Sequence, residues 1–153
     1  MTNKRARKDG EMSAWKTIVV GYDDTEPAKR ALSRAADMVA AGKGKLIVTS
    51  VAPVLPPAVA ARGLGPTDPV DPPERHHAEL EQARNFLQGQ GIAAEFDLQI
   101  GEPAEAIVKL ADKHQADAIV VGTREPGFVD RLMRGSVSQA VSKQAHCDVI
   151  IVH

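Results

Sequence analysis

The chain has 153 residues, of which 43% are apolar and 25% charged, and its formal net charge is -1. These values predict one globular domain with a core of ordinary size. A nearly neutral chain lacks the concentrated positive charge that phosphate backbones require, so nucleic acid is not an expected partner. The sequence has no apolar stretch of membrane-spanning length, and its single cysteine fits a reducing compartment. We therefore expect a cytoplasmic protein that does not bind membranes.

The first part of the chain predicts a tail, a strand, a helix and a second strand. Residues 1–14 include a basic run and no apolar pattern, which predicts a disordered tail ahead of a domain over 15–153. Residues 16–21 are apolar, β-branched and ended by glycine, as in a strand buried on both faces. Thr25 is a suitable cap for a helix that continues to Gly42. Residues 45–51 repeat the strand pattern.

The remaining elements follow a proline-rich segment. Seven of the ten prolines lie between 53 and 73, which predicts a long irregular loop. The later patterns predict helices over 74–88, from 103 onward and over 135–144, an edge strand over 94–100, and strands over 117–121 and 148–152. This alternation predicts an α/β fold: a five-stranded parallel, doubly wound sheet with helices on both faces. Ligands of such sheets bind beyond the carboxyl ends of the strands.

The last third of the chain contains a pattern suited to an anion. A buried strand leads to Gly122, and thirteen residues later Gly135 and Ser136 begin a helix whose free amides are able to hold a phosphate. In the alternative interpretation Gly122 only ends a strand and Ser136 only caps a helix. The sequence allows two roles for Asp23 and Asp24, which either face a ligand or cap the first helix.

Four ordered motifs resemble those of the universal stress protein family. They lie at 20–25, 101–107, 116–122 and 135–138, and the resemblance runs from Lys16 to His153. It implies a Rossmann-like sheet of the adenine nucleotide alpha-hydrolase-like type, and a homodimer. It further implies that the carboxyl edge of the sheet binds ATP, accompanied by Mg²⁺, or another adenine nucleotide such as AMP or cyclic AMP.

The resemblance also implies the residues of the nucleotide site. Asp23 matches the acidic residue that faces the ribose or adenine, and Val51 lies near the strand end that packs the base. The phosphate-binding signature of the family then corresponds to the following positions: Gly122, Thr123, Arg124, Gly135, Ser136 and Val137.

Glu125 departs from that signature, in which a second glycine is expected. Glycine lets backbone amides approach phosphates and tolerates positive φ, whereas glutamate adds a side chain and a negative charge. At about 5 Å and an effective dielectric near 20, two such charges repel by roughly 3 kcal/mol. Gly127 and the arginines at 124, 131 and 134 are able to offset this effect, and a less charged nucleotide would experience less of it.

Neither a catalytic site nor a metal site is expected. The sequence contains no nucleophile elbow and no complete P-loop. The pair His76–His77 does not have the spacing of a zinc site, and we interpret Cys147 as a small packed residue. Our first hypothesis is a nucleotide-responsive regulator of the stress response. The second is a dimeric interaction module that has lost nucleotide binding through Glu125. The third, slow ATP hydrolysis, rests on family analogy alone.

The last strand is predicted to form a homodimer interface. Four consecutive apolar residues there would lie exposed at a sheet edge: Val149, Ile150, Ile151 and Val152. A second copy of the chain is the natural partner for such an edge.

Overall fold

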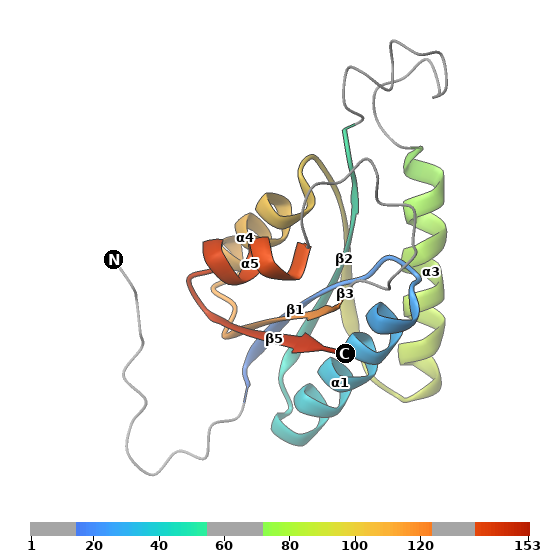
Figure 1. Ribbon diagram of the computed structural model, residues 1–153. Helices are drawn as coiled ribbons and strands as arrows, with labels where there is room; N and C mark the ends of the chain where they lie inside the picture. Colours follow the sequence, from blue (N-terminus) through green and yellow to red (C-terminus); the bar gives the residue numbers. More distant parts are fainter. Residues whose placement is uncertain (1–14, 55–71, 124–136) are drawn as a thin grey trace.

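A single parallel sheet forms the centre of the molecule in the computed structural model, which describes residues 15–54, 72–123 and 137–153 (Figure 1). Within these ranges its strand order is β3-β2-β1-β4-β5. The strands are β1 (Thr17–Gly21), β2 (Lys45–Ala52), β3 (Ala94–Ile100), β4 (Ala118–Gly122) and β5 (Asp148–Val152). β3 and β5 are the edge strands, as the sequence predicted.

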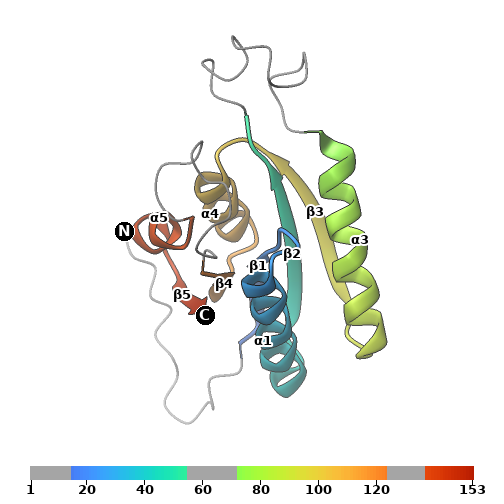
Figure 2. The same cartoon turned by 45° about the vertical axis from the view of Figure 1, so that its right-hand side comes forward.

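Helices cover both faces of the sheet (Figure 2). α1 (Glu26–Gly42) and α3 (Pro73–Gly89) lie on one face, and α4 (Pro103–Lys113) and α5 (Val137–Gln144) lie on the other. This arrangement confirms the predicted α/β fold with a five-stranded parallel, doubly wound sheet. The chain builds outward from β1 in both directions, so the strand order reverses between β1 and β4. In sheets of this type that reversal opens a crevice at the carboxyl ends of the two strands.

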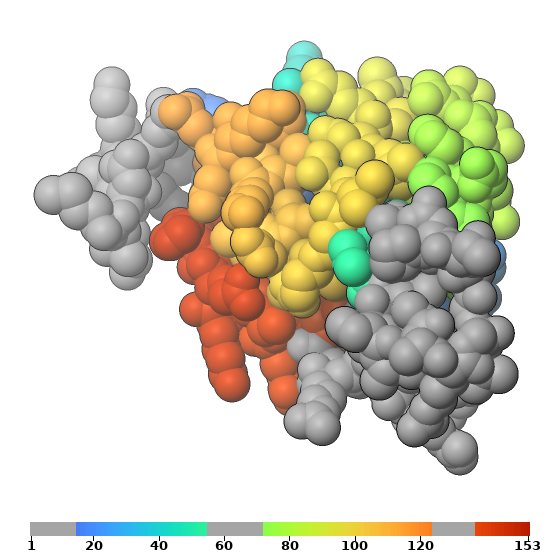
Figure 3. Space-filling model, turned by 90° about the horizontal axis from the view of Figure 1, so that it is seen from above, coloured from blue at the N-terminus to red at the C-terminus, as the bar shows by residue number. Residues whose placement is uncertain are grey.

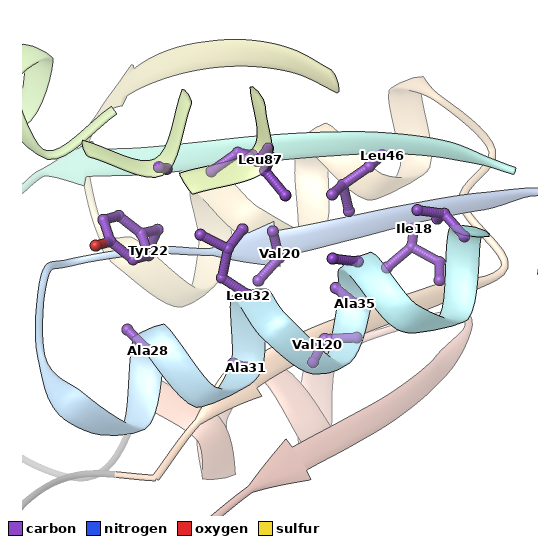
Figure 4. Close-up of a cluster of buried hydrophobic side chains, with 14 of the residues drawn as sticks. Ile18, Val20, Tyr22, Ala28, Ala31, Leu32, Ala35, Leu46, Leu87 and Val120 are labelled. Atoms are coloured by element: carbon purple, nitrogen blue, oxygen red, sulfur yellow. The ribbon is translucent and has the colours of Figure 1, made fainter. Parts of the chain in front are cut away.

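The core on the α1 side is made of branched strand residues and small helix residues (Figure 4). Ile18 and Val20 of β1 and Val120 of β4 are fully buried beneath Ala31 and Ala35 of α1. Alanine at helical spacing lets the helix lie close to the sheet, and the branched side chains fill the space between them. On the opposite face Val19, Ile47 and Ile119 pack against α4 and α5 in a second apolar cluster.

The element boundaries agree with the sequence prediction to within one or two residues, with informative exceptions. Pro73 begins α3 rather than ending the predicted loop over 53–73, because proline fits the first turn of a helix. The fourth strand begins at Ala118 and not at Asp117. The Asp117 carboxylate instead accepts hydrogen bonds from the backbone N–H groups of Lys16 and Thr17, at 3.0 and 2.8 Å. Three predicted segments lie outside the described residues: the tail 1–14, most of the proline-rich loop, and the start of the helix predicted at 135.

Candidate functional site

The sheet register brings three of the predicted site residues to one edge. Val20 of β1 pairs with Val48 of β2 and with Val120 of β4. Asp23, Val51 and Thr123 each lie three residues beyond that row, at the carboxyl ends of three neighbouring strands. Asp23 and Thr123 follow β1 and β4, and Val51 is the next-to-last residue of β2. Viewed from above, the molecule shows α4 and α5 in yellow to red on one side of this end and α3 in green on the other (Figure 3). The edge therefore contains the point where the strand order reverses.

Asp23 organises the turn between β1 and α1. Its Oδ1 atom accepts hydrogen bonds from the backbone N–H of Thr25 at 3.2 Å and from Thr25 Oγ1 at 2.6 Å. Thr25 in turn caps α1 by accepting from the N–H of Ala28 at 3.3 Å. Asp24 completes the turn with φ at 65°, a left-handed conformation that aspartate tolerates better than most residues. Thr25 and not Asp23 is therefore the cap of α1, and Asp23 holds the capping residue in place.

Gly122 is required by packing against α1. A Cβ atom at this position would lie 2.4 Å from the carbonyl carbon of Pro27 and 2.7 Å from the nitrogen of Ala28. Such distances are far below van der Waals contact, so β4 and the first turn of α1 are able to approach each other only because residue 122 is glycine. This packing contact alone explains why residue 122 is glycine, and no bound phosphate is needed to explain it. The contact also brings the end of β4 against the first turn of α1.

The remaining predicted residues occupy different environments. Val51 and Val137 are half-buried and pack against the apolar cluster beneath α4 and α5. The N–H of Thr123 donates to the carbonyl of Val152 at 2.8 Å, which continues the pairing of β4 with β5. Arg124, Gly135 and Ser136 lie outside the described residues, as does Glu125. The part of the predicted site that would hold the base and ribose is thus described, as is half of the six positions that would hold the phosphates.

A cavity of about 370 Å³ lies between the β1–α1 turn and α3. Its lining comprises Asp23, Asp24, Thr25, Glu26, Arg75, Ala78, Glu79 and Gln82. Four of these side chains are carboxylates and one is a guanidinium, so the field in this cavity does not favour the triphosphate of a nucleotide.

A polar cluster that the sequence analysis missed lies behind one wall of this cavity. Ser50 of β2 and His76 and Glu79 of α3 are all buried, and we call these three residues the buried polar cluster. Ser50 Oγ donates to Glu79 Oε2 at 2.7 Å and lies 2.9 Å from His76 Nδ1, and that nitrogen is 3.0 Å from Glu79 Oε2. The sequence did contain a signal for it. The apolar stripe Leu80, Ala83 and Leu87 extends back by one helical turn to residue 76.

The geometry of this cluster does not suit nucleophilic catalysis. A serine nucleophile needs one histidine nitrogen to take its proton while the acid bonds the other nitrogen. Here Ser50 and Glu79 approach the same Nδ1 atom, and the Ser50 hydroxyl donates directly to the carboxylate. Among residues 15–54, 72–123 and 137–153, moreover, no group of three His, Cys, Asp or Glu side chains is arranged to hold a metal ion.

Cys147 belongs to the core and not to a site. It is half-buried against the apolar cluster on the α4 and α5 face, as the sequence indicated. Burial raises the pKa of its thiol to about 11, with smaller contributions from Asp112 and other nearby carboxylates. The thiol is therefore protonated at neutral pH and weakly reactive.

Comparison with known proteins decides the family. The sequence model of the universal stress protein family matches residues 14–153. This chain belongs to the universal stress protein family. The universal stress protein Rv1636 of Mycobacterium tuberculosis is 36% identical over 149 residues, which cover 93% of this chain and 99% of that protein. No helix in the described part of this family member is long and apolar enough to cross a membrane.

Solved structures of other universal stress proteins share the fold. A universal stress protein in complex with cAMP is 30% identical, with a TM-score of 0.67, and the match covers 92% of this chain and 98% of that one. The crystal structure of Rv1636 from M. tuberculosis is 32% identical, with a TM-score of 0.59 over 94% of this chain and 98% of its own. The Rossmann-like fold is therefore common to this universal stress protein and its solved relatives.

Proposed function

We propose that this protein binds an adenine nucleotide at the carboxyl edge of its sheet and acts as a nucleotide-responsive regulator. The observation that carries the proposal is the register that aligns Asp23, Val51 and Thr123 at the carboxyl ends of three adjacent strands. This edge includes the reversal of strand order, where doubly wound sheets bind their ligands. A relative at 30% identity has been solved in complex with cAMP, which supports an adenine nucleotide as the ligand class.

In this proposal the two ends of the nucleotide contact different residues. Val51 supplies an apolar surface for the base, and Asp23 faces the ribose or adenine. The phosphates lie toward Gly122, Thr123, Arg124, Gly135, Ser136 and Val137. The acidic cavity beside α3 favours this orientation, because its four carboxylates repel phosphate. ATP would bring Mg²⁺ with it, whereas AMP or cyclic AMP presents less charge to Glu125. The role requires binding and release of a ligand and no catalysis.

Calorimetric titration with ATP, AMP and cyclic AMP tests this function. The natural protein is compared with Glu125→Gly, which restores the family signature, and with Glu105→Gly, which removes an exposed carboxylate on α4. We expect micromolar binding by the natural protein and tighter binding of ATP by Glu125→Gly, by up to about a hundredfold if the full repulsion of roughly 3 kcal/mol is relieved. Absence of binding by the natural protein would refute the proposal, and binding by Glu125→Gly alone would show that Glu125 has switched the site off.

A dimeric interaction module is the second candidate function. The observation that favours it is β5, an edge strand whose four apolar residues Val149 to Val152 are only half-buried. Pairing with a second copy would cover this edge and form a homodimer. Light scattering on the natural protein and on Ile151→Lys tests this interface. A dimer that Ile151→Lys converts to a monomer supports it, and a natural monomer at high concentration contradicts it. Binding at the interface without any nucleotide affinity would favour this candidate over the first.

A further inference from the structure

The buried polar cluster joins the start of α3 to the carboxyl end of β2. Ser50 is 1% exposed, and His76 and Glu79 are each 5% exposed. Because the Ser50 hydroxyl donates to Glu79, the hydrogen-bond network requires that His76 carry a hydrogen on Nδ1, shared between Ser50 Oγ and Glu79 Oε2. Each of the three groups therefore bonds the other two, and these bonds fix directions as well as distances.

This cluster is not needed to attach α3. Leu80, Ala83 and Leu87 of the same helix already bury an apolar stripe against the sheet, and α3 contacts both β2 and β3. Burying polar groups costs desolvation free energy that well-packed apolar residues would avoid. What a directional network adds to an apolar contact is a unique position of one element relative to another.

The element fixed in this way leads directly to the proposed nucleotide site. Ser50 immediately precedes Val51, whose side chain faces the other side of the sheet, toward α4 and α5. Tyr22, which immediately precedes Asp23, donates its backbone N–H to the carbonyl of Thr49 at 2.9 Å. The end of β2 is therefore bonded to the β1 end that leads to Asp23 as well as to α3.

The same cluster reaches the cavity beside Asp23. Glu79 forms part of that cavity's wall, and Arg75 Nε lies 3.6 Å from Glu79 Oε1. Tyr22 Oη donates to Gln82 Oε1 at 3.4 Å on the next turn of α3. Burial raises the pKa of Tyr22, and the negative charges of Asp24 and Glu79 raise it further, so the phenol stays protonated and able to donate.

We infer that Ser50, His76 and Glu79 are positioning residues for the nucleotide site: they hold the Val51 end of β2, and through it the Asp23 turn, in the arrangement that accepts the base and ribose. This inference rests on the proposed nucleotide-binding function. None of the three residues needs to touch the ligand.

The experiment compares nucleotide affinity and thermal stability across four variants. His76→Leu removes the Nδ1 donor while keeping an apolar side chain, and His76→Asn keeps an amide N–H close to the position of Nδ1. Ser50→Ala removes the same network from the strand side. Leu87→Val is the matched control, because it weakens the apolar attachment of α3 far from the cluster. Each is titrated with cyclic AMP and with ATP.

We expect His76→Leu and Ser50→Ala to bind about tenfold more weakly than the natural protein. His76→Asn should recover most of that loss, and Leu87→Val should lower the melting temperature without changing affinity. The inference is overturned if the natural protein binds and the cluster variants bind equally well, or if Leu87→Val weakens binding as much as they do. If His76→Leu does not fold, Ser50→Ala and His76→Asn decide the same question. Absence of binding by the natural protein overturns the nucleotide-binding function itself and this inference with it.

Discussion

The two helices on one face of the sheet are attached by different physical means. α1 lies against β1 and β4 through alanines and branched aliphatic residues, and Gly122 lets it approach to backbone contact. α3 combines an apolar stripe with the buried polar cluster in its first two turns. An apolar contact responds mainly to volume, whereas a hydrogen-bonded contact responds to direction. The difference indicates that α1 chiefly stabilises the fold and that the start of α3 chiefly positions the edge beside it.

The largest expected effect breaks the α1 contact. Gly122→Ala places a Cβ atom 2.4 Å from a backbone carbon of Pro27, and the backbone cannot move away as a flexible side chain would. We expect a loss of about 3 kcal/mol in the free energy of unfolding, at the upper end of overpacking costs. Urea denaturation followed by circular dichroism measures it.

Gly89→Ala is the control for that substitution. Gly89 is the last residue of α3, and a Cβ atom there would meet no atom within 4 Å among the described residues. Its stability should equal or slightly exceed that of the natural protein. Equal losses at both glycines would show that close approach to α1 is not the reason for Gly122.

The next largest effect on stability compares the loss of a bonded hydroxyl with the loss of an unbonded one at two adjacent residues of β2. Ser50→Ala removes a bonded hydroxyl from the buried polar cluster and should lower the free energy of unfolding by about 1–2 kcal/mol. Thr49→Val removes the neighbouring hydroxyl, which faces the other side of the sheet. Thr49 is fully buried, and its Oγ1 has no hydrogen-bond partner in the described part of the structure. That substitution should be neutral or stabilising, because a buried hydroxyl without a partner costs free energy. Chemical denaturation of both variants checks the contrast, and a larger loss for Thr49→Val would contradict it.

A smaller effect concerns the polar end of α1. Thr25→Ala removes the hydroxyl that accepts from the N–H of Ala28 and donates to Asp23. We expect the free energy of unfolding to fall by about 1 kcal/mol. Thr25→Ser keeps the hydroxyl and should remain close to the natural protein in a thermal melt. If the two variants are equally stable, the cap does not contribute as described.

The smallest effect on stability is expected at the thiol on the opposite face of the sheet. The pKa of Cys147 is raised to about 11 in the folded protein, above the ordinary range of a thiol, so its protonated form is favoured by folding. Any contribution to stability is fully present below about pH 8.5 and is lost as the pH rises toward 11. Alkylation of the native protein should therefore remain slow at pH 8 and accelerate toward pH 11, whereas the urea-unfolded protein should react readily at pH 8–9. Equal rates for the two states at pH 8 would show that the thiol is not protected.

Much of the fold was predictable from short-range pattern. Apolar, β-branched runs located β1, β2 and β4 to within one or two residues. The alternating pattern of 94–100 and the short apolar run of 148–152 fitted the two edge strands. The meeting of strand ends at one edge was also predictable, because the carboxyl ends of parallel strands share one edge. Asp23 and Val51 lie at that edge, and their role in a nucleotide site stays a prediction.

The remaining features depend on contacts between distant parts of the chain. Two such contacts follow only from the order of strands in the sheet. Gly122 packs against Pro27, and the Asp117 carboxylate accepts hydrogen bonds from the N–H groups of residues 16 and 17. Ser50 and Glu79 are 29 residues apart in sequence and become partners only when α3 packs on β2. A polar residue at helical spacing with apolar ones indicates that it is buried, as at His76, but does not identify its partner.

Chemical-shift mapping of the backbone amides during titration with cyclic AMP is the most direct measurement of where the protein binds its ligand. We predict that the shifts concentrate at 23–25, 51–52 and 122–123, at the carboxyl ends of β1, β2 and β4. Shifts confined to the opposite edge, at 43–44, 114–117 and 145–147, would contradict the proposed site. Unchanged spectra at millimolar cyclic AMP and ATP would contradict nucleotide binding altogether.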